Sequence, residues 1–377
     1  MARKLTNILV TGGAGFIGCN FIHFLFSDES GFNGKVINVD CLTYAGNAES
    51  LENIDEKFGS LAFKNGTLKE NEQRYFFEQV DICDSTAIGA ILKKYEIDTI
   101  VHFAAESHVD RSILGPEAFV KTNVMGTFTL LDLAKNYWKN EDGSIRDDVL
   151  FHHISTDEVY GSLGETGYFT ETTPYDPRSP YSSSKASSDH LVMAYYHTYG
   201  LPITLSNCTN NYGPYQFPEK LLPLMINNIK TGKNLPVYGD GLNIRDWVYV
   251  EDHNRAVWLI VQNGKTGEKY NIGGENEWQN IKLLHKVIEL TAAETGKSAE
   301  DVEKTITYVK DRPGHDKRYA IDCTKIKNEL GWERKMTFEQ GLLATVKWYL
   351  NNPEWINHIL SGDYKNWISK NYTDQGR

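Results

Sequence analysis

The chain has 377 residues, of which 40% are hydrophobic and 24% are charged, and its formal net charge is −11. This composition is typical of a soluble globular protein, and the acidic balance argues against binding DNA or RNA, which needs a basic surface. None of the five cysteines forms a CxxC pair or a zinc-like spacing, no signal-peptide pattern opens the chain, and no apolar run approaches the ~20 residues of a membrane span. We therefore expect a cytoplasmic protein without a metal site.

Short apolar runs alternate with helical patterns through the first half of the chain. Strands are expected at residues 7–11, 35–40, 78–81, 99–104, 151–155 and 203–207, and helices at 16–27, 85–95, 118–136 and 181–199. This alternation predicts βαβ units and a parallel sheet. Two polar stretches, residues 65–74 and 139–148, are expected to be exposed loops.

The sequence changes in character from about residue 210, where prolines and aromatic residues become dense. Residues 248–261 indicate a return to the sheet unit. A helix at 280–294, a strand at 305–310, a loop at 311–316 and further helical segments follow. We therefore predict two units: residues 1–208 with 244–273 form the sheet unit, and residues 209–243 with 274–377 form a smaller, discontinuous α/β lobe.

A glycine-rich turn, TGGAGFIG at residues 11–18, follows the first strand and opens the first helix. Glycines allow the tight turn and the approach of a pyrophosphate to the backbone, and the helix start offers N–H groups. Asp40 closes the second strand, where a carboxylate binds the adenosine ribose and favours NAD over NADP. These features predict a Rossmann-type, doubly wound sheet that binds NAD, with Asp81 and Ile82 beside the adenine.

Two further groups indicate acid–base chemistry. Tyr181 and Lys185 are four residues apart in a predicted helix, so they share one face, and a nearby ammonium can make a tyrosine phenolate available as a base. Thr156, Asp157 and Glu158 follow the strand at 151–155. Adjacent carboxylates there suit an acid–base pair whose pKa values are pushed apart, although an acidic surface turn is an alternative.

The glycine turn and the Tyr181–Lys185 pair together resemble the extended branch of the short-chain dehydrogenase/reductase family. The segment STDEVYG at residues 155–161 resembles the 4,6-dehydratases of that branch. Five more segments resemble the dTDP-glucose 4,6-dehydratase family: FAAESHVDRS (103–112), NNYGPYQFPEKLLP (210–223), RDWVYVEDH (245–253), RPGHDKRYAID (312–322) and SGDYKNW (361–367).

The resemblance implies a lyase that converts dTDP-glucose to dTDP-4-keto-6-deoxyglucose and water through transient hydride transfer to bound NAD. Tyr181 would take the proton of the sugar O4, and Lys185 would hold its pKa down and bind the nicotinamide ribose. Thr156 would bind O4, Glu158 would remove the C5 proton, and Asp157 would protonate the departing C6 hydroxyl. The resemblance also implies a homodimer that pairs helices 118–136 and 181–199, and a place in deoxysugar biosynthesis of the dTDP-rhamnose type.

The remaining site residues come from the fingerprint and the resemblance together. The cofactor-binding set is Gly12, Gly15, Phe16, Ile17, Gly18, Asp40, Leu42, Thr43, Asp81, Ile82, Phe103, Ala104, Ala105, Ser107, Thr122, Tyr181, Lys185 and Asn211. The substrate-binding set is Ser107, Thr156, Asn210, Lys220, Leu221, Pro236, Tyr238, Arg245, Asn271, Arg312 and His315. Of these, Arg245 and Arg312 suit a diphosphate, because guanidinium groups bind phosphate in a bidentate way.

Alternatives of two classes stay open. The first is a UDP-sugar 4-epimerase, a decarboxylase or a UDP-glucose 4,6-dehydratase of the same fold. The Asp157–Glu158 pair disfavours the epimerase and the decarboxylase, while only the resemblance favours thymine over uracil. The second is a non-catalytic sensor of NAD and sugar nucleotides, which would be expected to have lost Tyr181, Lys185 or the acidic pair.

Overall fold

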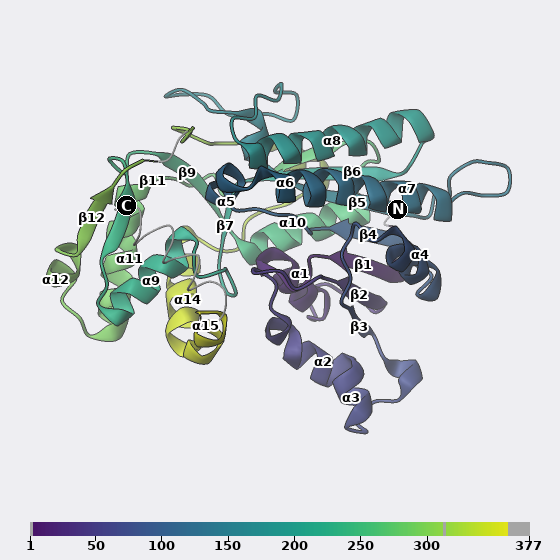
Figure 1. Cartoon of the computed structure of the whole chain (residues 1–377), viewed down its shortest axis with the longest axis horizontal. Coiled ribbons are helices and arrows are strands. Elements are labelled where there is room, and N and C mark those ends of the chain that lie inside the picture. Colours follow the sequence, from purple (N-terminus) through teal and green to yellow (C-terminus); the bar gives the residue numbers. More distant parts are fainter. Residues whose placement is uncertain (1–2, 312–313, 361–377) are drawn as a thin grey trace.

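The computed structural model describes residues 3–311 and 314–360 (Figure 1). Seven parallel strands form the central sheet in the order β10-β6-β5-β4-β1-β2-β3. The strands are β1 (Asn7–Thr11), β2 (Lys35–Val39), β3 (Tyr75–Glu78), β4 (Thr99–His102), β5 (Leu150–Thr156), β6 (Ile203–Cys208) and β10 (Lys269–Ile272). The predicted Rossmann-type sheet is thus confirmed.

The strand order reverses between β1 and β4, which makes their carboxyl ends a topological switch point. Ligands of open parallel sheets bind in the crevice at such a point. The register brings the strand ends level, because Thr11 pairs with both Val39 and His102, and Thr156 pairs with Cys208. The residues that follow these strands therefore meet at one edge of the sheet.

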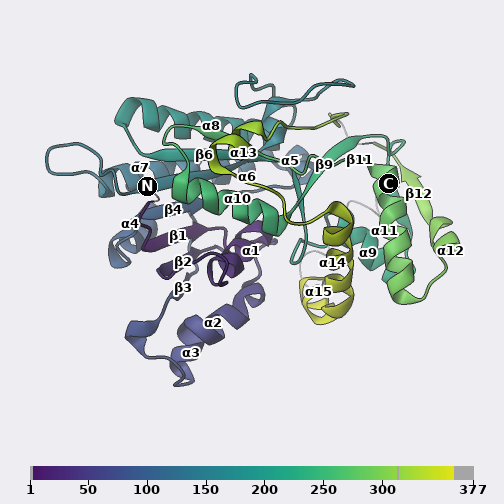
Figure 2. The same cartoon turned by 180° about the vertical axis from the view of Figure 1, so that it is seen from behind.

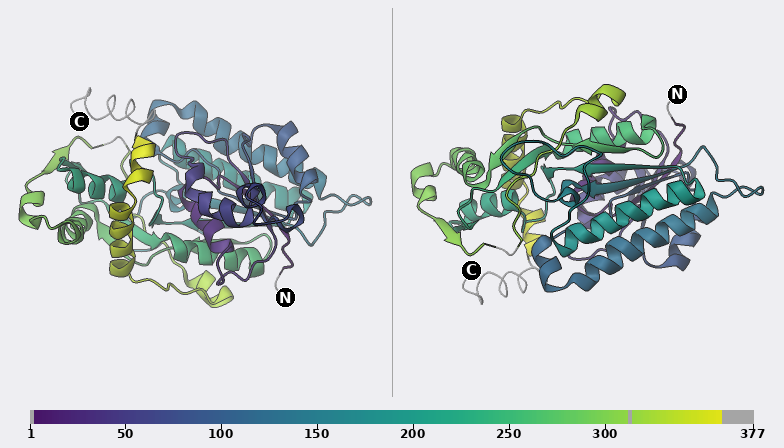
Figure 3. Two further views of the ribbon diagram at one scale, coloured as in Figure 1. Left: turned by 90° about the horizontal axis from the view of Figure 1, so that it is seen from below. Right: turned by 90° about the horizontal axis from the view of Figure 1, so that it is seen from above.

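Helices cover both faces of this sheet, as its apolar strands require. One face packs against α1 (Phe16–Leu25), α10 (Val250–Asn263) and α13 (Thr324–Leu330), which lie along the sheet in Figure 2. The other face packs against α4 (Ser85–Lys94), α7 (Thr127–Tyr137) and α8 (Pro180–Tyr199). Figure 3 shows α7 and α8 side by side.

Helix α8 carries the predicted Tyr181–Lys185 pair, and local signals fix both of its ends. Ser179 and Ser182 form a reciprocal capping box, and Pro180 occupies the first turn. Gly200 ends the helix with a φ of +69°, a conformation that glycine adopts without strain. The predicted helix at 181–199 is confirmed to within one residue.

The predicted helix at 118–136 is more complex than a single regular helix. It consists of α6 (Pro116–Phe119), a π-helical stretch η3 (Val120–Gly126) and α7. A helix precedes it directly, α5 (Val109–Leu114). A Cβ atom on Gly126 would lie 2.4 Å from the Ile82 side chain, so glycine allows η3 to approach the loop after β3. π-Helical turns are frequent at functional sites.

A second, smaller core lies to the left in Figure 1. It contains a sheet of β11 (Glu277–Gln279), β9 (Ile244–Tyr249) and β7 (Asn210–Tyr212), and a pair of β12 (Ile306–Val309) and β8 (Leu235–Tyr238). Its helices are α9 (Leu221–Thr231), α11 (Asn280–Thr295), α12 (Ala299–Glu303), α14 (Phe338–Asn351) and α15 (Pro353–Leu360). We propose the predicted two-unit division as a working description. Two parts of the chain cross this division. Tyr319, Ile326 and Trp332 pack into the core of the sheet unit, and β9, which lies within residues 244–273, belongs to the smaller core.

One local expectation was wrong. The third strand was predicted at residues 78–81 but is β3 at Tyr75–Glu78, where Tyr75 is buried and its hydroxyl accepts a hydrogen bond from Asn38. The structure also contains two helices for which no prediction was made, α2 (Glu52–Phe58) and α3 (Ser60–Lys64). The polar stretches 65–74 and 139–148 are mostly exposed, as predicted. No helix within the described ranges combines the length and the apolar character that a membrane span needs.

Candidate active site

The glycine turn after β1 is as tight as its sequence predicted. Gly12 has a φ of +70°, and a Cβ atom there would lie 2.6 Å from the backbone of Ala104. A Cβ atom on Gly18 would lie 2.3 Å from the Gly12 carbonyl oxygen. Gly15 begins α1 without a side-chain cap, and a Cβ atom there would stand 3.3 Å from that same oxygen. The start of α1, with Phe16 and Ile17 in its first turn, can therefore receive a pyrophosphate.

Asp40 lies at the end of β2 and faces this turn. Its Oδ2 accepts a hydrogen bond from the Ala14 amide at 3.0 Å, and its Oδ1 accepts one from the Leu42 amide at 2.8 Å. Burial raises the pKa of Asp40, whereas these two backbone N–H groups lower it. The carboxylate thus ties the glycine turn to the loop that contains Leu42 and Thr43, at the position where a ribose is expected.

The loops after β3 and β4 complete the cofactor side. Asp81 accepts a hydrogen bond from the Cys83 amide at 2.9 Å, and Ile82 is buried beside Gly126. The Phe103 amide donates to Thr11, and its ring packs 5.2 Å from that of Phe21.

Asn123 in η3 holds the loop after β4 in place. Its side chain exchanges hydrogen bonds with both the N–H and the C=O of Glu106 and donates to Ser184 Oγ at 2.8 Å. This clamp fixes the stretch that contains Ala104, Ala105 and Ser107 against α8. Thr122, the neighbouring residue in η3, is half-buried.

The acidic pair opens a short 3₁₀ helix, η4 (Asp157–Tyr160), at the carboxyl end of β5. Thr156 accepts a hydrogen bond from the Glu158 amide and donates one to Asp157 Oδ1, both at 3.3 Å. Asp157 is 1% exposed, and its Oδ2 has no hydrogen-bond partner within residues 3–311 and 314–360. Burial, with the charges of Glu158 and Asp246, raises the pKa of Asp157 well above its usual value. This environment therefore favours the protonated form of Asp157.

Tyr181 and Lys185 are both buried on the face of α8 that meets this strand end. Burial and the charge of Glu158 raise the pKa of Tyr181, and a hydrogen bond with Thr156 lowers it. The Lys185 ammonium donates to the Ile154 carbonyl at 2.7 Å and lies 3.3 Å from His153 Nε2. Burial lowers the pKa of Lys185 to about 8.

Several predicted substrate residues come from the smaller lobe and reach back to the sheet unit. Lys220 Nζ lies 3.5 Å from the Ser107 carbonyl oxygen, and the Tyr238 hydroxyl donates to Asp110 at 3.2 Å. His315 pairs with Asp311 at 2.6 Å and packs edge-on to Tyr238. Asn210 opens β7, Leu221 opens α9 and Pro236 lies in β8.

Arg245, Asn271 and Asn211 are more deeply buried. The Arg245 guanidinium stacks 4.3 Å above the Tyr319 ring, donates to the Asp316 carbonyl, and lowers the pKa of Asp157. Asn271 is fully buried, and its amide accepts from Tyr160 and donates to the Phe169 carbonyl. Asn211 donates to the Thr209 carbonyl. Arg312 and the segment at 361–367 lie outside the described residues.

The site also contains residues that the sequence analysis did not single out. Asp246 on β9 is 1% exposed, accepts hydrogen bonds from the amides of Gly274 and Asn276, and raises the pKa of Asp157. Tyr319 lies beside Arg245. Its pKa is raised mainly by burial and, to a smaller extent, by the charge of Glu158. Asp246 and Tyr319 both lie inside segments that carry the family resemblance, but the sequence alone gave neither residue a role.

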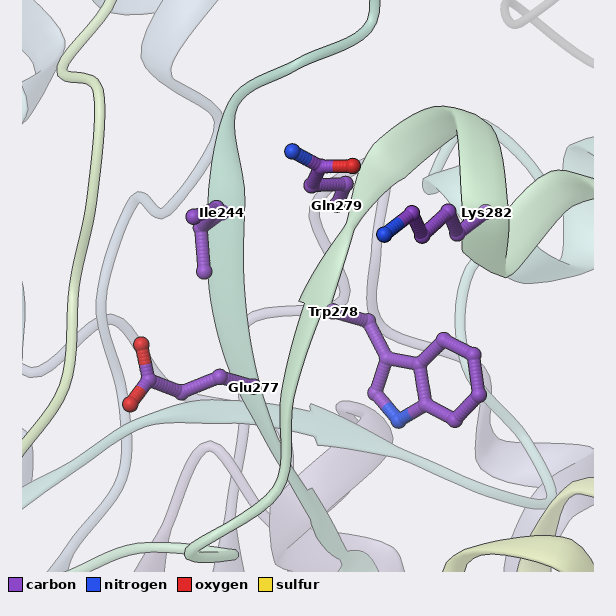
Figure 4. Close-up of a pocket in the computed structure, with 5 residues that line it drawn as sticks. All are labelled: Ile244, Glu277, Trp278, Gln279 and Lys282. Carbon is purple, nitrogen blue, oxygen red and sulfur yellow. The ribbon is translucent and has the colours of Figure 1, made fainter.

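A surface pocket of about 340 Å³ lies near this region and is shown in Figure 4. Its lining comes from β9, β11 and the start of α11, and consists of Ile244, Glu277, Trp278, Gln279 and Lys282. None of these five is a predicted site residue, so we do not assign the chemistry to it. Within residues 3–311 and 314–360, no three or more His, Cys, Asp or Glu side chains are grouped to hold a metal ion.

Comparison with known proteins agrees with this arrangement. Residues 9–345 match the family model of GDP-mannose 4,6 dehydratase. The dTDP-glucose 4,6-dehydratase of Escherichia coli is 51% identical over 374 residues, which cover 97% of this chain and 98% of that protein. The structure of the Bacillus anthracis dTDP-glucose 4,6-dehydratase in complex with NAD matches with a TM-score of 0.79 and 46% identity, covering 94% of this chain and 99% of that one.

A dTDP-glucose 4,6-dehydratase from Streptomyces venezuelae with NAD and TYD bound matches with a TM-score of 0.81 and 41% identity, covering 94% of this chain and 100% of that one. The range that matches the family model spans both units and contains the positions of the glycine turn, the acidic pair and the Tyr181–Lys185 pair. The chain therefore belongs to the GDP-mannose 4,6 dehydratase family, together with the dTDP-glucose 4,6-dehydratases that it resembles over nearly its whole length.

Proposed function

We propose that this chain is an NAD-dependent hydro-lyase that converts dTDP-glucose to dTDP-4-keto-6-deoxyglucose and water. The observation that carries the proposal is the pair at the end of β5, where burial and neighbouring charges raise the pKa of Asp157 and half-buried Glu158 is its neighbour. Loss of water across C5 and C6 needs one base and one acid side by side. Epimerisation at C4 needs neither a base at C5 nor an acid at C6.

The glycine turn and Asp40 fit NAD, because the turn leaves the start of α1 open and the carboxylate lies where the ribose hydroxyls are expected. Bound there, NAD⁺ would supply a reversible hydride acceptor for the sugar and a positive charge that favours the Tyr181 phenolate. The cofactor therefore ends in the oxidised form. We propose the full cofactor set predicted from the sequence as its binding residues.

In the first half of the reaction, Tyr181 takes the proton of the sugar O4 as hydride leaves C4. A hydrogen bond with the Thr156 hydroxyl lowers the pKa of Tyr181. In the reaction, this hydroxyl would turn its one proton from Asp157 Oδ1 to the developing phenolate, while its oxygen orients O4. The Lys185 ammonium lies one helical turn away and contributes positive charge. The product of this half is a 4-ketone, whose C5 proton is acidic.

In the second half, Glu158 removes the C5 proton and Asp157 donates its proton to the C6 hydroxyl, which leaves as water. Hydride returns to C6, and Glu158 returns its proton to C5. Tyr181 has then gained one proton and Asp157 has lost one. A proton transfer between them through solvent restores the site.

On the substrate side, we propose that Arg245 and Lys220 supply positive charge to the nucleotide diphosphate. Arg245 comes from β9 and Lys220 immediately precedes α9, so both approach from the smaller lobe. Ser107, Asn210, Leu221, Pro236, Tyr238 and His315 complete the proposed set. Asn271, whose amide is used inside the protein, supports Tyr160 beneath η4.

We also propose a homodimer in the cytoplasm that serves deoxysugar biosynthesis of the dTDP-rhamnose type. Apolar side chains are exposed on α5, η3, α7 and the neighbouring α8, where a second copy could cover them. They are Ile113, Leu114, Val120, Met125, Phe128 and Tyr199. All five cysteines are free, which suits a reducing compartment.

The test is to incubate the purified protein with dTDP-glucose and, in parallel, with UDP-glucose, without added reductant. We expect the 4-keto-6-deoxy product from dTDP-glucose, seen as the loss of one water in the mass spectrum and as enolate absorbance in alkali. Product from UDP-glucose alone would keep the mechanism and change the nucleotide. Conversion to the C4 epimer without dehydration would overturn the roles of Asp157 and Glu158.

A further inference from the structure

We propose that Asp189 is a positioning residue, which keeps the Lys185 ammonium charged and in place while the reaction runs. This inference rests on the proposed function and deepens it. Asp189 lies on α8 four residues after Lys185 and eight after Tyr181, so the three side chains follow one face of the helix. Asp189 does not touch the reacting atoms, and it acts through Lys185.

The Asp189 carboxylate is 1% exposed and lies among hydrogen-bond donors. Its Oδ2 accepts from Ser155 Oγ at 2.7 Å, from the Tyr175 hydroxyl at 2.9 Å and from Asn207 Nδ2 at 3.4 Å. These donors come from β5, β6 and the loop before α8. Burial raises the pKa of Asp189, whereas the charge of Lys185 and the hydrogen bonds from these three donors lower it. The three donors and the nearby ammonium therefore favour the anion against the cost of burial.

Lys185 faces that charge across a single imidazole ring. His153 Nε2 lies 3.3 Å from Lys185 Nζ and 3.2 Å from Asp189 Oδ1. Burial, and then the charge of Lys185, lower the pKa of His153 well below its usual value, so the ring is neutral. A neutral imidazole can accept from the ammonium or donate to the carboxylate through this nitrogen, and in either tautomer it separates the two charges without cancelling them.

The remaining groups around this pair cannot replace Asp189. His102 is also buried and neutral, and the Cys208 thiol is protonated because burial raises its pKa to about 12. Tyr160 and Tyr175 are phenols whose pKa values burial raises further. Lys269, half-buried above the Tyr175 ring, is a second cation that faces Asp189. Of the groups named here, Asp189 is therefore the anion that offsets the cost of burying the Lys185 ammonium.

Burial lowers the pKa of Lys185 to about 8, and the charge of Asp189 opposes that shift. With a neutral residue at position 189, Lys185 would lose its proton at lower pH. The charges that act on Asp157 come from Glu158, Asp246 and Arg245, so a change at position 189 leaves that acid in place. A shift in the alkaline limb of the pH profile therefore reports on Lys185.

The experiment compares Asp189→Asn with the wild type, with Asp189→Glu, which keeps the charge, and with Ser155→Ala, which removes one donor but leaves the carboxylate. For each, kcat for dTDP-glucose dehydration and the affinity for NAD are measured from pH 6 to pH 10. For Asp189→Asn, we expect the alkaline limb of both profiles to move down by about one pH unit or more, equivalent to a tenfold change in the Lys185 proton equilibrium. Asp189→Glu and Ser155→Ala should keep the limb of the wild type.

A uniform loss of activity at every pH, with the limb of Asp189→Asn unmoved, would overturn the proposal and leave Asp189 a purely structural role. Asp189→Ser, smaller and also neutral, replaces the Asn variant if that one does not fold, and the same two results decide. Failure of the wild type to dehydrate dTDP-glucose would instead count against the proposed function. The pH dependence of NAD affinity would still test Asp189 in that case, because it needs no turnover.

Discussion

At the scale of single residues, Asp157 and Glu158 show how burial gives neighbouring carboxyl groups different roles. Asp157 is buried, which raises its pKa, whereas Glu158 is half-buried beside it. The folded pKa of Asp157 lies above its unfolded value, so its ionised form costs stability at pH values above the unfolded pKa. Burying the acid that the reaction needs therefore lowers the free energy of unfolding, as is common at active sites.

We expect Asp157→Asn to lower kcat for dehydration by about 10²–10⁴, because the amide cannot protonate the C6 hydroxyl. The midpoint of thermal unfolding at pH 8 should stay the same or rise, since the variant no longer buries an ionisable carboxyl. Product formation followed by mass spectrometry, together with a melting curve, checks both. Asp176→Asn, at an exposed carboxylate, serves as the control with unchanged kcat. Full activity in Asp157→Asn would remove Asp157 from the acid role.

Sequence patterns located these residues but not their surroundings. The Thr156–Glu158 segment and the Tyr181–Lys185 pair were identified by residue type and spacing, which the chemistry constrains. Asp189 and Asp246 were not, because an aspartate within a helix or a strand has no distinctive pattern until the fold buries it. Asn271 was assigned to the substrate by the resemblance alone, and its hydrogen bonds with Tyr160 and the Phe169 carbonyl could not be predicted from the sequence.

At the scale of elements, the strand–turn–helix unit of β1 and α1 combines two demands on its glycines. Gly18 meets a packing demand, because any Cβ atom would collide with the Gly12 carbonyl. Gly15 meets a binding demand, because a Cβ atom there would be tolerated at 3.3 Å from that oxygen but would stand at the start of α1. The two positions should therefore respond differently to the same substitution.

We expect Gly15→Ala to weaken NAD binding at least tenfold, by about 1.4 kcal/mol or more, with little change in thermal stability. Gly18→Ala should lose both NAD affinity and stability, because backbone must move to admit the methyl group. Calorimetric NAD titrations and melting curves of the two variants test this difference. Gly164→Ala, where a Cβ atom meets open space, is the matched control and should change neither quantity. Equal NAD affinity in Gly15→Ala and the wild type would contradict the placement of the pyrophosphate.

The elements that the sequence located well are those with strong local signals. Helix α8 has a capping box and a terminal glycine, and β1 is a short apolar run before a glycine turn. The third strand was misplaced because Tyr75–Glu78 is rich in aromatics and lacks β-branched residues, and because the polar run before it extends to Arg74. Helices α2 and α3 were missed because few of their residues are buried, which leaves little apolar periodicity to detect.

At the scale of the whole molecule, one charged cluster joins the two units at the rim of the site. Arg111 on α5 pairs with Glu219, just before α9, at 3.2 Å, and its guanidinium lies 3.7 Å above the ring of Tyr44. His108 approaches the same carboxylate at 3.6 Å. Three segments therefore meet around the buried Glu219 carboxylate. They are the loop after β2, the helix α5 after β4, and the start of the smaller lobe. Lys220, the lysine proposed to bind the substrate, directly follows Glu219. The contact between Arg111 and Glu219 therefore also fixes the backbone position of Lys220.

We expect Arg111→Ala to destabilise the protein by about 3 kcal/mol at pH 8, because it leaves the Glu219 carboxylate buried without its main partner. Burial already raises the pKa of Glu219, and Lys220 and Arg111 oppose that shift, so its pKa should rise further in the variant. The folded pKa then exceeds the unfolded one, and the penalty present at high pH should shrink as the pH falls toward 5 and the carboxyl group takes up a proton. Urea unfolding at pH 5 and pH 8 measures this difference.

Arg178→Ala, which breaks the exposed pair with Asp176, should cost less than about 1 kcal/mol at both pH values. If Arg111→Ala were equally stable at the two pH values, Glu219 would not be the anion that joins the units. If it lost stability only at pH 8 while its KM for dTDP-glucose also rose, the cluster would link the two units to the placement of the substrate.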